Sequence, residues 1–242
     1  MTRKDTLYRE QDEGAGSFRF DERVADVFPD MIRRSVPGYE LIVPMIGQLA
    51  RRHGGDGTVL YDLGCSLGAV TLAMADALAG REVRIVAVDD SEAMARRCRS
   101  AVERRAPAVP VQVLQGDVRG VAIADASMVV LNFTLQFIDE TERLAVLRRI
   151  REGLRPGGVL VLSEKIRFED EGEQERQTDW HHDFKRMQGY SELEIARKRS
   201  ALERVLKPET ERAHIQRLRE AGFARVTRWF QCFAFCSYLA EK

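Results

Sequence analysis

A short apolar stretch followed by closely spaced glycines is the part of this chain best suited to bind a polar ligand. Residues 59–63 are Val-Leu-Tyr-Asp-Leu, and Gly64 and Gly68 come next, ahead of a helix-forming run over residues 69–78. A buried strand that turns through glycines into a helix gathers backbone N–H groups and the positive helix end at one point. Glycine at such a turn permits positive φ and a close approach of the ligand.

The spacing of these glycines separates two classes of cofactor. The dinucleotide fingerprint is G-x-G-x-x-G, and its second glycine is absent here. What remains is Asp62-x-Gly64-x-x-x-Gly68, which resembles the first motif of class I S-adenosylmethionine (SAM)-dependent enzymes. In those enzymes the loop holds an amino acid and a nucleoside. Many other α/β proteins carry glycines at such a turn, so further residues have to support this interpretation.

Polar residues end three further predicted strands. Asp89 follows the glycine loop by about 20 residues, where an acid binds ribose hydroxyls; the alternative is a solvent-facing loop acid like its neighbour Asp90. Asp117 lies where SAM enzymes often hold the adenine amino group, or it is an ordinary turn aspartate. Asn132 either contacts the ligand or caps the end of its strand.

The residues after Asn132 bear on the type of substrate. Base N-methyltransferases carry an Asn/Asp-Pro-Pro-aromatic box at this place, whereas this chain has Asn132-Phe133-Thr134-Leu135. The missing prolines argue against methylation of a flipped base.

Arg199 breaks an otherwise apolar helical pattern. Ile195, Leu202 and Leu206 form a stripe at i, i+7 and i+11, and Arg199 falls at i+4 within it, with Lys198 on the flank. A guanidinium directed into an apolar face requires an anion, because an unpaired buried charge costs several kcal/mol. Its bidentate fork suits a carboxylate. The alternatives are an ion pair with an acid of the chain itself, or snorkelling to the edge.

The sequence His181-His182-Asp183 is a second cluster of titratable groups. Adjacent histidines point apart on any regular element, and no third ligand has the spacing of a tetrahedral zinc site, so we expect no metal. Packing or hydrogen bonding within a lid is the expected role. The sequence also lacks a nucleophile elbow, a P-loop and a zincin motif.

The elements that position these residues alternate regularly along the chain. Strand and helix alternation at this spacing predicts a doubly wound, mostly parallel sheet with its ligand at the carboxyl ends of the strands, closed by an antiparallel C-terminal hairpin. The predicted strands are residues 59–63, 83–88, 110–115, 127–133, 159–163, 225–230 and 232–239. The predicted helices are residues 21–35, with Asp21 as N-cap, and 39–52, 69–78, 91–105, 141–153, 191–206 and 208–221.

We expect one domain over residues 1–242, in which residues 1–20 form a flexible arm and residues 21–53 form N-terminal helices. The segment 164–190 interrupts the alternation, and with the helix that follows it the region 164–206 is expected to act as a lid over the strand ends.

Composition excludes several classes of protein. The chain has 242 residues and a formal net charge of zero, so no overall field attracts RNA or an anionic membrane. We find no run long enough to span a membrane and no signal-peptide core. The four cysteines form no C-x-x-C pair, which favours reduced thiols and a cytoplasmic protein.

Longer stretches of the chain resemble one particular family, the carboxy-S-adenosyl-L-methionine (carboxy-SAM) synthases of the class I SAM-dependent methyltransferase superfamily. The resemblance covers nearly the whole chain and is more specific than the glycine loop. Its strongest segments are residues 20–25, 27–32, 34–39, 61–68, 126–137, 181–185 and 189–195.

The resemblance implies a set of ligand contacts. Position 90 is asparagine in relatives and aspartate here, and Arg199 matches an arginine that binds the added carboxylate, in its own or in the partner subunit's pocket. The residues implied to line the SAM site are Tyr39, Gly64, Cys65, Ser66, Asp89, Asp90, Asp117, Val118, Asn132 and Arg199.

The resemblance also implies an activity. Family members convert SAM and prephenate into carboxy-SAM and phenylpyruvate, as homodimers, and a partner enzyme then carboxymethylates hydroxyuridine at the tRNA wobble position. This chemistry needs a closed pocket that keeps water away from a sulfonium ylide, and little acid–base machinery.

Two other functions remain as alternatives. An ordinary small-molecule SAM-dependent methyltransferase would explain the glycine loop but not the arginine within the apolar stripe. A non-catalytic tRNA-binding module is disfavoured by the zero net charge and by the absence of an aromatic–basic RNA motif, so we expect no direct tRNA binding.

Overall fold

The computed structural model describes residues 3–8, 18–203 and 205–242, and within them seven strands form one sheet. The strand order is β3-β2-β1-β4-β5-β7-β6. Neighbours from β3 to β5 pair in parallel, while β7 pairs antiparallel with β5 and with β6. The doubly wound, mostly parallel sheet with a C-terminal hairpin is thereby confirmed. The strands are β1 Val59–Leu63, β2 Arg84–Asp89, β3 Val111–Gln115, β4 Ala126–Asn132, β5 Leu154–Lys165, β6 Arg225–Cys232 and β7 Phe235–Glu241.

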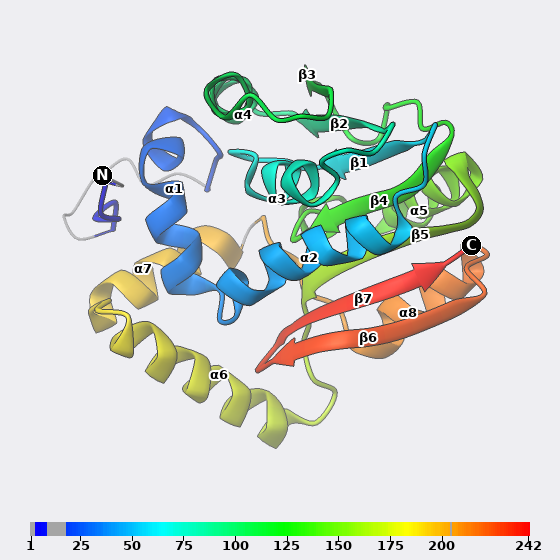
Figure 1. Ribbon diagram of the computed structural model, residues 1–242. Coiled ribbons are helices and arrows are strands. Elements are labelled where there is room, and N and C mark those ends of the chain that lie inside the picture. The colour runs from blue at the N-terminus through cyan, green and yellow to red at the C-terminus, as the bar shows by residue number, and fades with distance from the viewer. Residues whose placement is uncertain (1–2, 9–17, 204) are drawn as a thin grey trace.

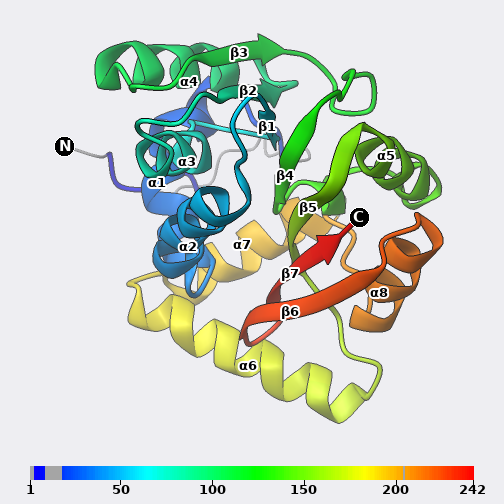
Figure 2. The ribbon, with the colours of Figure 1, turned by 45° about the vertical axis from the view of Figure 1, so that its right-hand side comes forward.

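Helices cover both faces of the sheet, as Figures 1 and 2 show. Apolar side chains of α2 and α3 form a core with one face, and those of α5 and α8 form a second core with the other. The central strands β1 and β4 are buried along almost their whole length, which explains their largely apolar sequences, whereas the edge strand β3 is partly exposed. The helices are α1 Glu22–Ser35, α2 Tyr39–His53, α3 Ala69–Ala77, α4 Glu92–Arg105, α5 Glu140–Gly153, α6 Glu171–Met187, α7 Glu192–Glu203 and α8 Glu211–Glu220, with a 3-10 turn η1 at Leu135–Phe137.

The N-terminal segment differs from the expected flexible arm. Asp5 is only 1% exposed, and its carboxylate accepts hydrogen bonds from the Tyr190 hydroxyl and the Lys198 ammonium. The expectation of a loose arm is therefore wrong for Asp5, whereas Arg3, Lys4 and Thr6 are exposed; residues 9–17 lie outside the described residues. Asp21 caps α1 as predicted, by accepting a hydrogen bond from the Val24 N–H.

The predicted lid is helical in its central part. In Figure 1, α6 and α7 lie together near α1, at the end of the sheet where the parallel strands finish. The region begins after β5, because that strand extends through Lys165. Hydrogen bonds join the lid to α1 at three places. The His181 ring nitrogen Nε2 lies 2.8 Å from the Ser35 carbonyl oxygen, the Lys198 ammonium donates to the Ser35 hydroxyl, and the Arg34 guanidinium donates to the Gln188 carbonyl oxygen at 2.8 Å. None of the helices in the described segments is both long and apolar enough to span a membrane.

Candidate functional site

The carboxyl ends of the parallel strands surround a cavity of about 500 Å³. Its size lies within the range of about 300–1,000 Å³ that is usual for small-molecule sites. The loops after β1, β2, β3 and β4 contribute to its wall, together with α1, α2, α6, α7 and the end of β5. Nine of the ten residues that the sequence predicted for the SAM site line this cavity: Tyr39, Gly64, Cys65, Ser66, Asp89, Asp90, Asp117, Val118 and Asn132.

The backbone conformation of the glycine loop explains why position 64 is a glycine. Gly64 has φ +83°, and a Cβ atom there would lie 2.2 Å from the Thr134 hydroxyl oxygen. Ser66 has φ +51° and Phe133 has φ +62°, although neither is glycine. Left-handed backbone at non-glycine residues is uncommon and tends to occur at functional sites. Both residues line the cavity, so the strained backbone lies where a ligand would bind.

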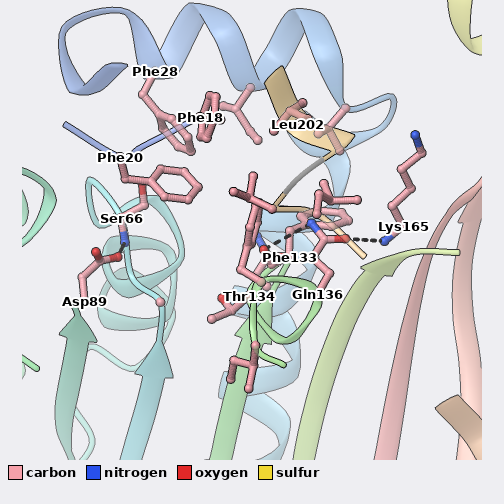
Figure 3. Close-up of a pocket in the computed structure, with 18 of the residues that line it drawn as sticks. Phe18, Phe20, Phe28, Ser66, Asp89, Phe133, Thr134, Gln136, Lys165 and Leu202 are labelled. Carbon is pink, nitrogen blue, oxygen red and sulfur yellow. Dashed lines mark hydrogen bonds between the residues drawn. The ribbon is translucent and has the colours of Figure 1, made fainter. Parts of the chain in front are cut away.

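Asp89 is fixed by the loop that faces it, as Figure 3 shows for Ser66. Its two carboxylate oxygens accept hydrogen bonds from the backbone N–H groups of Ser66 (2.8 Å) and Ser91 (3.0 Å). Burial raises the pKa of Asp89 to about 6, against the opposing effect of these hydrogen bonds. A carboxylate has about four acceptor positions, so two remain for the hydroxyls of a ribose.

Asp62 also lines the cavity. It is the first residue of the glycine motif, but it was not among the predicted site residues. It is 1% exposed, accepts a hydrogen bond from the Thr71 hydroxyl, and burial raises its pKa to about 7. Burial, and then the charge of Asp62, raises the pKa of the Tyr39 phenol above its usual range. Tyr39 therefore stays neutral and can donate a hydrogen bond at any physiological pH.

Asp117 is already engaged by a cation. The Arg119 guanidinium donates to both Asp117 carboxylate oxygens and also pairs with Glu142. This pairing holds the pKa of Asp117 below its ordinary value. Asp117 is consequently ionised and accepts hydrogen bonds, as the amino group of an adenine would require, but it shares its oxygens with Arg119.

Asn132 presents an unused acceptor to the cavity. Its side-chain oxygen is buried, and no group in the described part of the chain donates a hydrogen bond to it. A buried amide oxygen without a partner costs about 1–3 kcal/mol. Of the two roles that the sequence left open, ligand contact explains this oxygen better than a capping role does.

Aromatic side chains cover the loop side of the cavity. Phe18, Phe20 and Phe28 lie above the glycine loop in Figure 3, and the ring centroids of Phe20 and Phe137 are 5.3 Å apart. Such a cover excludes water from a nucleoside or sulfonium bound beneath it. None of these phenylalanines was assigned to the site from sequence. Phe18 and Phe20 lie in a polar segment without periodicity, and Phe28 lies in the predicted helix 21–35, where an apolar residue indicates core packing.

Lysine side chains gather at the other end of the cavity. Lys165 ends β5, Lys185 lies on α6 and Lys198 lies on α7, and all three line the cavity. The Gln136 side-chain oxygen accepts the Lys165 backbone N–H at 3.0 Å and so fixes the end of β5 (Figure 3). His181 lies beside them, with its ring 5.0 Å from that of Phe235.

Arg199 does not occupy the position that its sequence pattern predicted. It is exposed, and it is not among the cavity-lining residues of the described chain. The charged residues of α7 that are buried with Ile195 are Glu194, at 3% exposure, and Lys198, at 4%. The expectation that Arg199 is buried within the apolar stripe is therefore wrong. The positive charge of Arg199 still lowers the pKa of Lys165 and of Lys185, so the guanidinium is close enough to repel both ammonium groups.

His181 is packed and hydrogen-bonded within the lid, the kind of role expected for the histidine pair. The His181 ring meets the Ser35 carbonyl group, and burial followed by the charge of Lys185 lowers its pKa well below the ordinary value. Among the described residues we find no group of three His, Cys, Asp or Glu side chains arranged to hold a metal ion.

Comparison with known proteins agrees with this geometry. Residues 60–158 match a family model described as a methyltransferase domain. A protein of Geobacter sp. (strain M21) named carboxy-S-adenosyl-L-methionine synthase is 52% identical over 244 residues, covering 100% of both chains. Proteins with the same name from Klebsiella pneumoniae (strain ATCC 700721) and Salmonella paratyphi C are 50% and 52% identical, each over 100% of this chain and 98% of the relative.

Solved structures show the same fold at low identity. A mitomycin 7-O-methyltransferase superposes with a TM-score of 0.61 and 15% identity, over 98% of this chain and 60% of its own. The SAM-dependent methyltransferase SibL gives a TM-score of 0.61 and 15% identity, over 91% of this chain and 58% of its own. At this identity the likeness concerns the fold alone, which is the Rossmann-like fold of class I SAM-dependent methyltransferases.

Proposed function

Because the chain belongs to the family of carboxy-S-adenosyl-L-methionine synthases, we propose that it takes the carboxyl group for its product from prephenate. The observation that carries this proposal is the identity of about half of all residues over the full chain, combined with a cavity lined by nine of the ten expected SAM-site residues. The enzyme is SAM-dependent, and the identity of the second substrate is the proposed part.

The reaction proposed for this cavity balances without an added cofactor. The prephenate dianion loses carbon dioxide and hydroxide and becomes the phenylpyruvate monoanion. The hydroxide removes a proton from the SAM methyl group and leaves as water. The resulting ylide carbon then forms a bond to carbon dioxide, which gives the carboxymethyl sulfonium of carboxy-SAM. Both carbon dioxide and the ylide have to remain enclosed between these steps.

We propose that SAM lies across the strand ends from β3 to β4. Asp89 would hold the ribose, Asp117 and Val118 the adenine, and the glycine loop the methionine part. The unpartnered oxygen of Asn132 supports a donor of the ligand at that position. Asp90, which lines the cavity, would offer a carboxylate oxygen where relatives offer an amide.

We propose that α6, α7 and the aromatic side chains Phe18, Phe20 and Phe28 enclose the reacting groups in the cavity. Hydrogen bonds of His181 and Lys198 to Ser35 hold the lid against α1. Phe20 and Phe137, which both line the cavity, pack edge to face. These contacts support a cavity whose reacting centre is separated from bulk water, which the ylide requires.

We propose that Arg199 binds the carboxylate added to SAM, as the family resemblance implies. Its exposed position means that the guanidinium has to turn into the cavity when the product forms, or has to enter the cavity of a second subunit. Exposed apolar side chains on α2, α6 and α7 support the proposed homodimer: Leu41, Met45, Met187 and Leu193.

The proposed use of the product lies in tRNA modification. A separate tRNA carboxymethyltransferase would transfer the carboxymethyl group to the wobble uridine, and this chain would not itself bind tRNA. Supply of that enzyme places the proposed site of action in the cytoplasm. A chain of zero net charge fits an enzyme that hands over a small molecule rather than one that holds RNA.

Product analysis tests the proposal against ordinary methyl transfer. The purified protein is incubated with SAM and prephenate, and the nucleoside products are separated by mass. We expect SAM to gain the mass of one carbon dioxide and phenylpyruvate to appear in equal amount. Formation of S-adenosylhomocysteine as the main product would instead identify a conventional methyltransferase.

A further inference from the structure

The lysines of this chain are concentrated in one place. The sequence has 38 lysine and arginine residues, but only six of them are lysines, and three of those six line the cavity. Lys185 is 8% exposed and Lys198 is 4% exposed, although lysine is rarely buried unless it is paired. The three residues come from β5, α6 and α7, so the fold, and not local sequence, brings them together.

The three ammonium groups differ in their partners. Lys198 donates to the Ser35 hydroxyl at 2.8 Å and to the Asp5 carboxylate at 3.4 Å. Within residues 3–8, 18–203 and 205–242, no hydrogen bond or ion pair engages the ammonium of Lys165 or Lys185. The Lys165 ammonium lies 6.0 Å from the centre of the Phe235 ring. Lys198 is thus neutralised by the chain, whereas the other two face the cavity without an anion.

The charged groups that shift the pKa of Lys165 and Lys185 are all positive. Burial, followed by the charges of Lys165, Lys198 and Arg199, lowers the pKa of Lys185 to about 7. Burial and Arg199 lower the pKa of Lys165, and no acid acts against either shift. An anion that entered this end of the cavity would relieve the mutual repulsion and restore both ammonium charges.

SAM does not supply that anion. Its sulfonium is positive and is best placed away from a group of cations, while its own carboxylate belongs at the glycine loop, on β1. Lys165 lies two strands from β1, across β4, which is about 10 Å at the usual strand spacing. The second substrate of the proposed reaction is a dianion with one carboxylate on its ring and one on its pyruvyl side chain.

We propose, building on the function above, that Lys165 and Lys185 form the carboxylate subsite of the second substrate and bind its pyruvyl carboxylate. The ring carboxylate has to lose its charge as it leaves as carbon dioxide, so an ion pair there would stabilise the starting state and slow the reaction. The pyruvyl carboxylate keeps its charge in the phenylpyruvate product and is the group that a lysine pair can hold throughout. The ring carboxylate then faces the apolar wall at Val36 and Phe133.

Phenylpyruvate is the probe that tests this assignment, because it retains only the pyruvyl carboxylate. Calorimetry measures its affinity, and separately that of SAM, for wild type, Lys165→Met, Lys185→Met and Lys185→Arg. The matched control is Lys242→Met, which removes the same charge where its ammonium contacts the carbonyl group of Leu154, at the opposite end of β5. Thermal unfolding verifies that each variant is folded.

Loss of one ion pair in a partly buried site weakens binding by about 10- to 100-fold. We expect phenylpyruvate affinity to fall by that factor in both methionine variants and to recover within about threefold in Lys185→Arg. It should stay unchanged in Lys242→Met. SAM affinity should not fall in any variant, and the KM for prephenate should rise in parallel with the loss of phenylpyruvate affinity.

Two kinds of failure are distinguishable. If wild type makes carboxy-SAM from prephenate while folded methionine variants bind phenylpyruvate as wild type does, the lysine subsite is refuted and the proposed function stands. If the lysines govern phenylpyruvate binding but no carboxy-SAM forms, the subsite stands and the proposed function does not. Loss of SAM affinity in the methionine variants would assign the lysines to the first substrate and would also overturn the subsite.

Discussion

Replacing Lys185 by methionine is expected to stabilise the protein in the absence of ligand. Lys185 is 8% exposed and faces Lys165, Lys198 and Arg199 with no described acid to offset them. Methionine has a similar length and flexible stem, so it retains most of the packing while removing the buried charge. The wild-type residue would thus be kept for substrate binding at the expense of stability.

The size and the pH dependence of this effect follow from the pKa. A fall from 10.5 to about 7 corresponds to about 5 kcal/mol of unfavourable free energy for the protonated form in the native state. Allowing for relaxation and some lost packing, we expect a gain of about 2–4 kcal/mol at pH 7, or about 5–10 °C in Tm. Because the native pKa lies below the unfolded value, wild type binds fewer protons when native than when unfolded between about pH 7 and 10.5. Its stability therefore rises with pH across that window, and the advantage of the variant shrinks.

Thermal and urea unfolding at about pH 6.5, 8 and 9.5 measure this difference for wild type, Lys185→Met and the control Lys242→Met. The variant should be more stable than wild type at the lowest pH and should approach it at the highest, while the control shows no such trend. A methionine variant that is no more stable at about pH 6.5, or an advantage independent of pH, would refute the reasoning.

Three further predictions concern the SAM end of the cavity. Gly64→Ala should lower the free energy of unfolding by about 3 kcal/mol or more and abolish SAM binding, because its Cβ would meet Thr134. The control Gly57→Ala, at φ +70° with no atom within 4 Å of its Cβ, should lower it by only about 1 kcal/mol in the same unfolding assay. Asn132→Ala should weaken SAM binding about tenfold in calorimetry, since it removes an acceptor that a ligand donor would use; an unchanged affinity would contradict that contact. Arg199→Ala should lose affinity for carboxy-SAM far more than for SAM, and equal losses for both ligands would speak against its proposed role. If Arg199 enters the partner's cavity, a mixture of the Arg199→Ala and Asn132→Ala variants should be more active than the average of the two variants measured alone.

The strand-end residues were predictable from sequence because their positions follow from a general rule. In a parallel sheet the carboxyl ends of neighbouring strands meet at one edge, so Asp89, Asp117 and Asn132 had to converge once the strands were recognised. The glycine loop likewise required no knowledge of distant contacts. All of them line the cavity.

The orientation of α7 was not predictable in the same way. At 100° per residue, Arg199 lies about 40° and Lys198 about 60° from Ile195, on opposite sides, so periodicity alone slightly favours Arg199 for burial. The choice is made by partners far away in sequence. Lys198 contacts Asp5 and Ser35, which no local pattern on α7 reveals.

The lysine pair and the burial of Asp5 were missed for the same reason. In the sequence Lys165 follows a predicted strand, and Lys185 is one of many charges in the polar segment 164–190. A signal was nevertheless present, since lysine is scarce in a chain rich in arginine. Asp5 lies in a short polar segment, and its carboxylate is bound by Tyr190 and Lys198, more than 180 residues later in the sequence.

Transfer of an isotopic label tests the proposed carboxyl transfer most directly. Prephenate carrying carbon-13 in its ring carboxylate is incubated with the protein and unlabelled SAM, and the nucleoside product is analysed by mass and by carbon NMR. Carboxy-SAM should carry the label in its new carboxylate, and phenylpyruvate should be unlabelled. A labelled phenylpyruvate with unlabelled carboxy-SAM, or S-adenosylhomocysteine in place of carboxy-SAM, would contradict the transfer.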